Sequence, residues 1–208
     1  MKKSKRKKKS NSWKIKQHRD QYFKKSKSLG YRSRASFKLI ELNEKFKFLK
    51  SNISLLDLGS SPGGWSQVAS ANVTIGKILS IDINNMMPLK NVKFLQSDIF
   101  DQNTKNEISN YFKEKLDVII SDMAADTTGN KSLDSIRTNQ ICTETISLAS
   151  KILKPKGVLV TKLFMGDDFL EVKNLAKSLF KNVDFFKPKS SRSESKETYL
   201  HCNILKSL

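Results

Sequence analysis

Short apolar runs alternate with helical stretches along most of this chain, and this alternation constrains the fold more than any other feature. Five runs have centres too apolar to face water, and they span residues 53–60, 77–83, 92–99, 116–124 and 157–164. Such runs are typical of strands that are buried on both faces. Strands that alternate with helices are joined by right-handed crossovers, so we expect an α/β fold with helices on both faces of a mostly parallel sheet.

Helical periodicity and two late apolar runs complete the predicted elements. The spacing of apolar residues predicts helices over residues 33–48, 64–72, 104–115, 134–154 and 167–180. Pro155 and Gly157 should end the fourth of these helices. The runs at 182–188 and 198–205 are predicted to form a hairpin-like pair, which brings the sheet to seven strands.

The basic charge of the chain is concentrated at its N-terminus. The formal net charge is +19, and residues 1–34 carry 15 Lys or Arg against one Asp, which is 15 − 1 = +14. We therefore predict a flexible basic arm over residues 1–28 and one folded domain over residues 29–208, because like charges repel and cannot bury enough apolar surface. An anionic polymer is the natural partner of such an arm. A solvated tail and a nuclear localisation signal are alternative interpretations.

The cysteines and the hydropathy pattern exclude several classes of protein. Cys142 and Cys202 lie far apart, without a CxxC motif or a histidine cluster, which argues against a zinc site or a disulfide framework. The N-terminal lysines precede no apolar signal-peptide region, and no run of about 18 apolar residues occurs. We expect a cytoplasmic protein with no bound metal and no membrane partner.

A glycine-rich loop follows the first predicted strand. The stretch "DLGSSPGGWSQ", residues 57–67, contains Gly59, Gly63 and Gly64 directly before a predicted helix. Glycines allow a tight turn and a close approach of the backbone to a ligand. No Gly-Lys-Ser/Thr follows and the GxGxxG spacing is absent, so the loop matches neither a Walker A motif nor a dinucleotide site. A plain strand-to-helix turn is the alternative.

Carboxylates follow three further predicted strands. Asp82 and Asp98 lie where the second and third strands end, where a carboxylate can bind ribose hydroxyls or contact the edge of an adenine. Together with the glycine loop they indicate an adenosine-bearing ligand such as S-adenosylmethionine, although aspartate at such a position is often only a cap or a turn former. Asp122 follows the fourth strand and Lys162 lies near the end of the fifth. If these strands are neighbours the two side chains converge, as a structural ion pair or as part of a reactive site.

Several motifs, in this order, resemble one family: the FtsJ-type (RlmE) ribosomal RNA 2′-O-methyltransferases. They are "YRSRASFKL", "LDLGSSPGGWSQ", "SDMA", "VTKLFMG" and "KPKSSRSESKETY", which cover nearly the whole chain after the arm. The resemblance implies a single-domain Rossmann-like methyltransferase fold that binds S-adenosylmethionine. It also implies a catalytic tetrad and a set of cofactor contacts. The tetrad falls on Lys38, Asp122, Lys162 and Glu197, and the cofactor contacts on Gly63, Trp65, Asp82, Asp98 and Asp122.

The tetrad suits a reaction in which a ribose hydroxyl loses a proton as it attacks a methyl group about 3 Å away. We expect Lys162 to be the general base. Desolvation, Lys38 and the positive cofactor favour its neutral form, while the two carboxylates oppose them. Lys38 would position the substrate, and Asp122 and Glu197 would orient the lysines.

The resemblance further implies the substrate. Bacterial members of the family act on a uridine of 23S ribosomal RNA in the large ribosomal subunit, so we expect this RNA as the partner of a monomeric enzyme. A transfer RNA, an mRNA cap, and a non-catalytic role in ribosome assembly are the alternatives. Arg32, Arg34 and residues 187–193 are expected to contact the RNA backbone. The chain has Ala125 and Asp126 where the family usually has proline and asparagine, which bears on the loop over the acceptor nucleotide.

Overall fold

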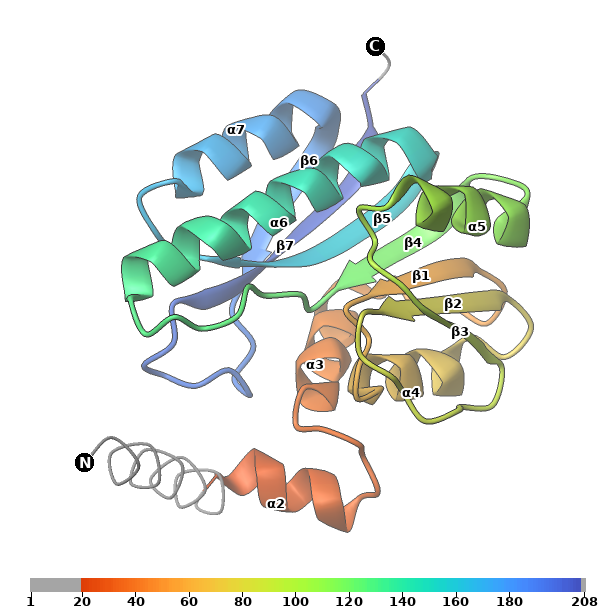
Figure 1. Cartoon of the computed structure of the whole chain (residues 1–208), viewed down its shortest axis with the longest axis horizontal. Helices are drawn as coiled ribbons and strands as arrows, with labels where there is room; N and C mark the ends of the chain where they lie inside the picture. The colour runs from red at the N-terminus through yellow and green to blue at the C-terminus, as the bar shows by residue number, and fades with distance from the viewer. Residues whose placement is uncertain (1–19, 207–208) are drawn as a thin grey trace.

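A seven-stranded sheet forms the centre of the molecule, as the computed structural model shows for residues 20–206 (Figure 1). The strand order is β3-β2-β1-β4-β5-β7-β6. The strands are β1 (Ser54–Leu58), β2 (Lys77–Asp82), β3 (Val92–Gln96), β4 (Leu116–Ser121), β5 (Leu153–Phe164), β6 (Phe180–Phe186) and β7 (Glu197–Leu205). The predicted α/β class and the seven strands are confirmed.

Among the seven described strands, six run in the same direction and β7 runs antiparallel to them. β1 pairs in parallel with both β2 and β4, and β4 pairs in parallel with β5. β7 is antiparallel to both β5 and β6. The predicted pair of C-terminal strands, β6 and β7, is therefore present, and β7 lies between β5 and β6 in the sheet. The chain therefore places the start of β7 beside the end of β5, where Lys162 lies.

Helices cover both faces of the sheet (Figure 1). The described helices are α2 (Gln21–Ser28), α3 (Ser36–Phe46), α4 (Gly64–Asn72), α5 (Gln102–Phe112), α6 (Lys131–Ile152) and α7 (Phe169–Leu179). One apolar core lies between the sheet and α5, α6 and α7, with buried residues such as Ile108, Ile146 and Val172. The other lies between the sheet and α3 and α4, with Leu39 and Val68. Burying apolar surface on both faces is what keeps a parallel sheet stable in water.

The structure corrects three local predictions. β3 is only partly buried because it lies at the edge of the sheet, where one side of the strand has no neighbour. α3 spans Ser36–Phe46 rather than 33–48, and it ends where Lys47 adopts a left-handed conformation with φ 56°. α6 ends at Ile152 and β5 begins at the next residue, so Pro155 lies within the irregular first part of a strand.

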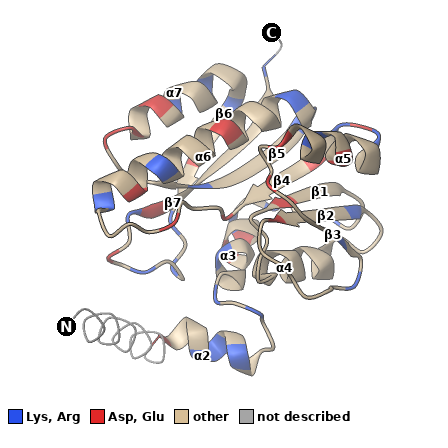
Figure 2. Ribbon diagram, viewed as in Figure 1, with Lys and Arg blue, Asp and Glu red and all other residues tan. Residues whose placement is uncertain are grey.

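Helix α2 occupies part of the segment for which we predicted a flexible arm, residues 1–28. Residues 1–19 lie outside the described part of the chain, whereas Gln21–Ser28 form a helix that contacts α3. The ring of Tyr22 lies 5.5 Å from that of Phe37. Figure 2 shows Lys and Arg residues on α2. This helix has only eight residues, three of which are lysines, so the sequence analysis assigned the segment to the basic arm because of its charge.

Candidate active site

The candidate site lies at the carboxyl ends of β1, β4 and β5, where ligands bind in open α/β sheets. The strand order reverses between β1 and β4, because β2 and β3 lie on one side of β1 and β4 and β5 on the other. Four polar side chains that are distant in sequence meet there. They are Lys38 from α3, Asp122 after β4, Lys162 from β5 and Glu197 from the start of β7.

Lys162 is buried, and two oxygens of Asp122 accept from its ammonium group. The side-chain nitrogen Nζ lies 2.8 Å from Asp122 Oδ1 and 2.6 Å from the Asp122 main-chain oxygen. The whole residue is only 8% exposed. Burial acts to raise the pKa of Asp122, but Lys162 and Lys38 outweigh it and hold that pKa below its usual value. The predicted convergence of these two side chains is confirmed.

Glu197 lies between Lys38 and Lys162 and interacts with both. Lys38 Nζ lies 2.7 Å from each carboxylate oxygen of Glu197, and Lys162 Nζ lies 3.9 Å from Oε2. The Ser191 hydroxyl donates to Oε1 of the same carboxylate at 2.8 Å. Glu197 therefore stands between two ammonium groups, and the four residues form a connected set of alternating charges.

Tyr199 is a functional candidate that the sequence reasoning missed. Its hydroxyl donates to Asp122 Oδ1 at 2.6 Å, and the residue is fully buried. It lies directly across from Lys162 in the pairing of β5 and β7. A signal was available, because residues two apart on a strand point to the same side, and Tyr199 follows Glu197 by two. Burial and the nearby Asp122 raise its pKa well above its usual value, so the phenol stays a hydrogen-bond donor.

The glycine loop is closely packed, which explains its composition. Gly59 has φ +71°, and a Cβ there would lie 2.4 Å from Met123 Cγ. Gly63 has φ +107°, in the left-handed region that favours glycine, and its Cβ would lie 2.7 Å from the Arg32 guanidinium. The loop therefore needs glycine for its backbone shape as well as for close contacts.

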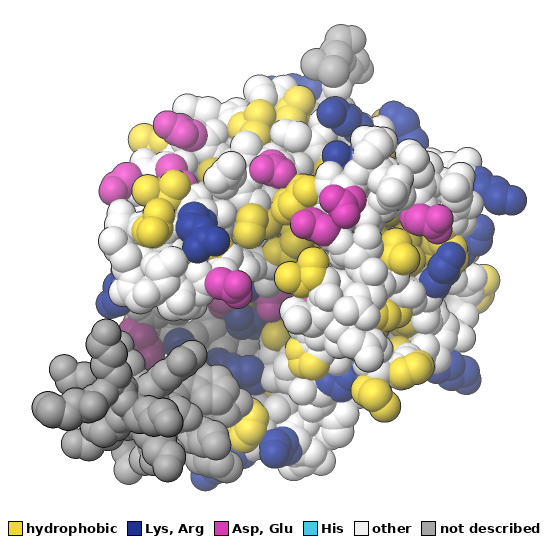
Figure 3. Space-filling model, in the orientation of Figure 1, with side chains coloured by type: hydrophobic (Ala, Val, Ile, Leu, Met, Phe, Trp, Pro, Cys, Tyr) yellow, Lys and Arg dark blue, Asp and Glu magenta, His cyan; other side chains and the backbone are white. Residues whose placement is uncertain are grey.

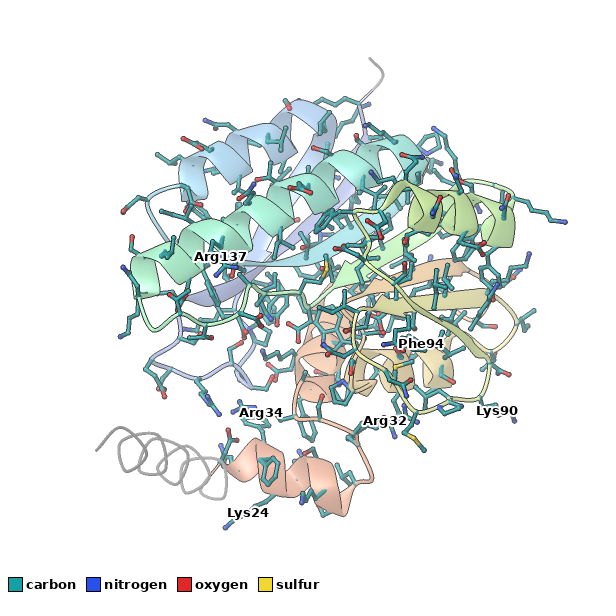
Figure 4. All side chains as sticks on the ribbon, viewed as in Figure 1. Lys24, Arg32, Arg34, Lys90, Phe94 and Arg137 are labelled. Atoms are coloured by element: carbon teal, nitrogen blue, oxygen red, sulfur yellow. The ribbon has the colours of Figure 1, made fainter. Side chains whose placement is uncertain are left out.

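Arg32 connects this loop to the segment between β2 and β3. Its guanidinium donates to the main-chain oxygens of Met87 and Pro88 at 2.6 and 2.7 Å. Its backbone N–H donates to Gln67 at 3.0 Å. Figure 4 shows Arg32 on the segment that joins α2 to α3. We expected Arg32 to contact RNA, but in this structure its donors are used for contacts within the chain.

A cavity of about 310 Å³ opens beside the glycine loop. Its lining includes Gly59, Asp82, Asp98 and Asp122, from the ends of four neighbouring strands. Asp82 accepts hydrogen bonds from the backbone of Ser61 at 2.8 Å, which ties it to the loop. The volume lies within the range of about 300 to 1,000 Å³ that is usual for small-molecule sites, and the carboxylates suit a ligand with hydroxyl and amino groups. A nucleoside-containing cofactor therefore fits the residues that are present.

The other two predicted cofactor residues lie elsewhere around the loop. Gly63 precedes α4 and does not line this cavity. Trp65 is 3% exposed, and its indole nitrogen donates to the Ala35 main-chain oxygen at 2.9 Å. The Trp65 ring lies 5.6 Å from that of Tyr199, so it packs between the glycine loop and the tetrad.

Asp57, at the start of the glycine-loop motif, is a buried carboxyl group, and a hydrogen bond from Ser66 reaches only one of its two oxygens. Its Oδ2 accepts from the Ser66 hydroxyl at 2.6 Å, whereas its buried Oδ1 has no hydrogen-bond partner among the described residues. Burial, helped by Asp122 and Asp82, raises its pKa to about 7. The sequence reasoning assigned no role to this residue.

The loop that departs from the family pattern is anchored on α6. Ala125 N–H donates to the Thr138 hydroxyl at 3.2 Å, and the Asp126 main-chain oxygen accepts from Arg137 at 3.4 Å. Arg137 lies in the first half of α6 (Figure 4). Asp126 also lines the cavity beside the glycine loop, so the departure changes the charge at the cavity wall.

No three His, Cys, Asp or Glu side chains in residues 20–206 are grouped so as to hold a metal ion. Within the same residues, no helix is long and apolar enough to cross a membrane.

Comparison with known proteins identifies related sequences along almost the whole chain. The model of the FtsJ-like methyltransferase family matches residues 31–204. A protein of Pelagibacter ubique named ribosomal RNA large subunit methyltransferase E is 45% identical over 197 residues, which is 95% of this chain and 97% of that protein. A Rickettsia akari protein of the same name is also 45% identical, over 92% of this chain and 87% of that one.

Solved structures agree in fold. A Plasmodium falciparum protein assigned as a ribosomal RNA methyltransferase superposes with a TM-score of 0.76 at 33% identity, over 84% of this chain and 98% of that one. Human methyltransferase-like protein 13, bound to SAH, has a TM-score of 0.58 at 16% identity, over 81% and 79% of the two chains. The second similarity concerns the fold alone, and it is the fold of a methyltransferase.

Proposed function

The chain belongs to the FtsJ-like methyltransferase family, and from this premise we propose that it methylates the ribose 2′-oxygen of a uridine in the 23S ribosomal RNA of the large subunit. As a member of the family, the protein is a methyltransferase whose methyl donor is S-adenosylmethionine. The observation that carries the proposal is the connected set of Lys38, Asp122, Lys162 and Glu197, which is complete within one chain.

We assign cofactor binding to the cavity beside the glycine loop. Asp82 and Asp98 would hold the hydroxyl and amino groups of the adenosine part, and Gly63 and Trp65 would shape the loop around the rest. Asp122 borders both the cavity and the tetrad. When bound, S-adenosylmethionine supplies an activated methyl group to the acceptor oxygen.

Lys162 is proposed to accept the proton of the 2′-hydroxyl. Two oxygens of Asp122 accept from Nζ, an arrangement that suits an ammonium group, so the group must lose one proton before it can act as a base. Lys38, a second lysine of the tetrad, lies on the far side of Glu197.

The other three residues would hold Lys162 and the substrate in place. Asp122 keeps Nζ at the strand end, and the hydroxyl of Tyr199 fixes the same carboxylate from the opposite side. Lys38 would hold the acceptor nucleotide, while Glu197 fixes Lys38. Keeping reacting groups within a fraction of an ångström is worth large factors in rate, which is why four residues are needed around one proton transfer.

The choice of ribosomal RNA rests on the relatives, which carry this activity in their names at 45% identity. We propose that the enzyme acts in the cytoplasm, because its proposed substrate is ribosomal RNA. We also propose that it acts as a monomer, with residues 1–28 as a basic arm and residues 29–208 as the methyltransferase domain. The proposed tetrad requires no residue from a second chain.

The proposal is tested by transfer of a radiolabelled methyl group from S-adenosylmethionine. Large ribosomal subunits from cells that lack the protein are expected to accept the label on one uridine, whereas naked transfer RNA should not. Mapping 2′-O-methyl positions with and without the protein would identify the nucleotide. Label on transfer RNA alone would favour a different substrate, and no label on any RNA would favour a role in ribosome assembly without catalysis.

A further inference from the structure

A hollow of about 780 Å³ lies between α2 and the segment that joins β6 to β7. A second hollow, of about 330 Å³, opens onto Lys38 and Glu197 of the tetrad. We call the first the clasp hollow and the second the acceptor hollow. Arg34, Arg192 and Glu194 line both of them, so the two hollows share one wall. Figure 4 shows Arg34 between α2 and the rest of the molecule.

A single carboxylate serves both arginines of this shared wall. Arg34 Nη1 forms an ion pair with Asp20 Oδ2, and Arg192 Nε lies 3.7 Å from the same oxygen. The other oxygen of Asp20 caps α2 by accepting from the backbone of Tyr22 and Phe23 at 3.0 and 3.2 Å. The side chain of Asp20 is 10% exposed, against 44% for that of Arg192. Both arginines thus lie near the same oxygen of Asp20, at the edge of the acceptor hollow that Glu194 and Glu197 also line.

Arg34 has hydrogen-bonding capacity that Asp20 does not use. Its Nη2 donates to the Ser190 main-chain oxygen, and its buried Nε has no partner among the described residues. Burial and the neighbouring Arg192 lower the pKa of Arg34, which reflects crowding of positive charge. A phosphate group has more acceptor oxygens than a carboxylate, and the guanidinium fork binds both kinds of anion.

The opposite wall of the clasp hollow is held in place within the chain. The carboxylate of Glu41 on α3 accepts from the backbone N–H groups of Lys189 and Ser190, at 2.5 and 3.0 Å. Lys187 donates to the main-chain oxygens of Ser193 and Ser195 at 3.2 and 2.6 Å. The segment that carries Arg192 is therefore organised before any ligand arrives, whereas Asp20 comes from the start of α2.

We propose that the clasp hollow binds a backbone phosphate of the RNA substrate next to the acceptor nucleotide, and that Asp20 occupies its two arginines until the phosphate displaces it. This inference rests on the proposed function, because it takes the anion to be RNA. Residues 1–19, with ten Lys or Arg residues, join α2 at Asp20. Loss of the Asp20 contacts on RNA binding would thus uncouple the start of α2, where the arm is attached, from the acceptor site.

The test is a measurement of RNA affinity in variants that remove the charge of Asp20 but keep the helix cap. Asn and Ser both supply a capping oxygen, so Asp20→Asn and Asp20→Ser should preserve α2. Fluorescence anisotropy with a short labelled single-stranded RNA should show binding about threefold to fivefold tighter in both variants, the range expected from removing a partly exposed ion pair that competes with the ligand. Circular dichroism melting checks that each variant is folded.

Two further variants make the test specific. Glu107→Gln, on an exposed position of α5, changes the net charge by the same amount and should alter affinity by less than about a factor of two because salt screens distant charges. In an Arg192→Ala background the gain from Asp20→Asn should shrink. Equal or weaker binding by both Asp20 variants, or an equal gain in Glu107→Gln, would overturn the proposal.

This experiment separates the inference from the proposed function, because anisotropy requires no methyl transfer. If the wild-type protein methylates ribosomal RNA but the Asp20 variants bind no more tightly, the competition by Asp20 is wrong and the proposed function stands. If they bind more tightly while no RNA accepts a methyl group, the phosphate site stands and the proposed function fails.

Discussion

At the scale of single residues, the buried ammonium of Lys162 is compensated from two different strands. Asp122 after β4 contacts it directly, and Glu197 at the start of β7 lies 3.9 Å away. Burying a charge without partners is costly, and removing one partner of a buried pair leaves the other uncompensated. This arrangement gives the lysine a fixed position, which a general base requires.

Replacing Lys162 with methionine should abolish most methyl transfer. Methionine keeps the length of the side chain but cannot accept a proton, and loss of a general base costs about 10²- to 10⁴-fold in rate. Single-turnover methyl transfer measures this, and calorimetric titration should show unchanged binding of S-adenosylmethionine.

Lys154→Met is the matched control for that variant. Lys154 lies at the start of the same strand, whereas Lys162 lies near its end, and it forms a partly exposed ion pair with Asp117 at 2.9 Å. This variant should keep near-normal activity. Near-normal activity in Lys162→Met as well would exclude Lys162 as the base.

Asp57 predicts a pH dependence of stability. Its folded-state pKa of about 7 lies above the ordinary value of about 3.9, so the folded state binds one more proton than the unfolded state between those values. The stability that the protonated carboxyl contributes is full below about pH 4 and is lost as the pH rises to about 7. Asp57→Asn should remove this part of the pH dependence, which amounts to about 4 kcal/mol at most.

Thermal melting between acid and neutral pH checks this prediction. Asn preserves the size of the side chain, and its amide oxygen can still accept from the Ser66 hydroxyl that now bonds Asp57. The variant should gain melting temperature relative to the wild type as the pH rises. A constant difference across the range would mean that Asp57 does not titrate there.

At the scale of elements, strand β7 does the most to build the site. It pairs with β5 over residues 158–164, which brings Tyr199 opposite Lys162 and Glu197 opposite Phe164. The alternation of the first five strands with helices could be predicted from the sequence. The position of β7 between β5 and β6 in the sheet could not. Which strands pair depends on the whole sheet, and local sequence patterns do not predict it.

The basic arm predicts a salt-dependent contribution to RNA binding. Residues 1–12 carry seven Lys or Arg, and their removal should weaken binding and flatten the dependence of log K on log salt. The slope should fall by at most about 5, since each phosphate contact on single-stranded RNA contributes about 0.7. Anisotropy titrations at several salt concentrations measure the slope.

Binding of S-adenosylmethionine is the control for the truncated protein, because these residues lie outside the predicted domain. Affinity for the cofactor should be the same with and without them. An unchanged salt slope would show that the arm makes no contact with RNA.

At the scale of the whole molecule, charge is distributed so that the body stays nearly balanced. On the face shown in Figure 3, basic, acidic and hydrophobic side chains are intermingled, with no single charged area. The RNA contact that we propose at Arg34 and Arg192 depends on the positions of these two cations.

Cofactor binding should stabilise the entire fold, since the cavity is built from the ends of several strands. S-adenosylmethionine at 100 times its Kd should add about 2.7 kcal/mol to the free energy of unfolding. For a chain of this size that corresponds to a rise in Tm of roughly 5 to 10 °C. Asp82→Asn should give a smaller rise in the same melting experiment, and an equal rise would remove Asp82 from the cofactor site.

The sequence by itself determined the α/β class and the glycine loop, and it predicted that Asp122 and Lys162 converge if their strands are neighbours, which the pairing of β4 with β5 decided. These features depend on local periodicity and on the residues at strand ends, which can be read from short stretches of the sequence. Lys38 and Glu197 could be placed only by resemblance, because α3 and the start of β7 meet only when the sheet is complete. The tertiary structure alone decided that Tyr199 fixes Asp122 and that Asp20 holds Arg34 and Arg192. Contacts between side chains far apart in the chain arise from packing of the whole fold, and neither composition nor periodicity contains them.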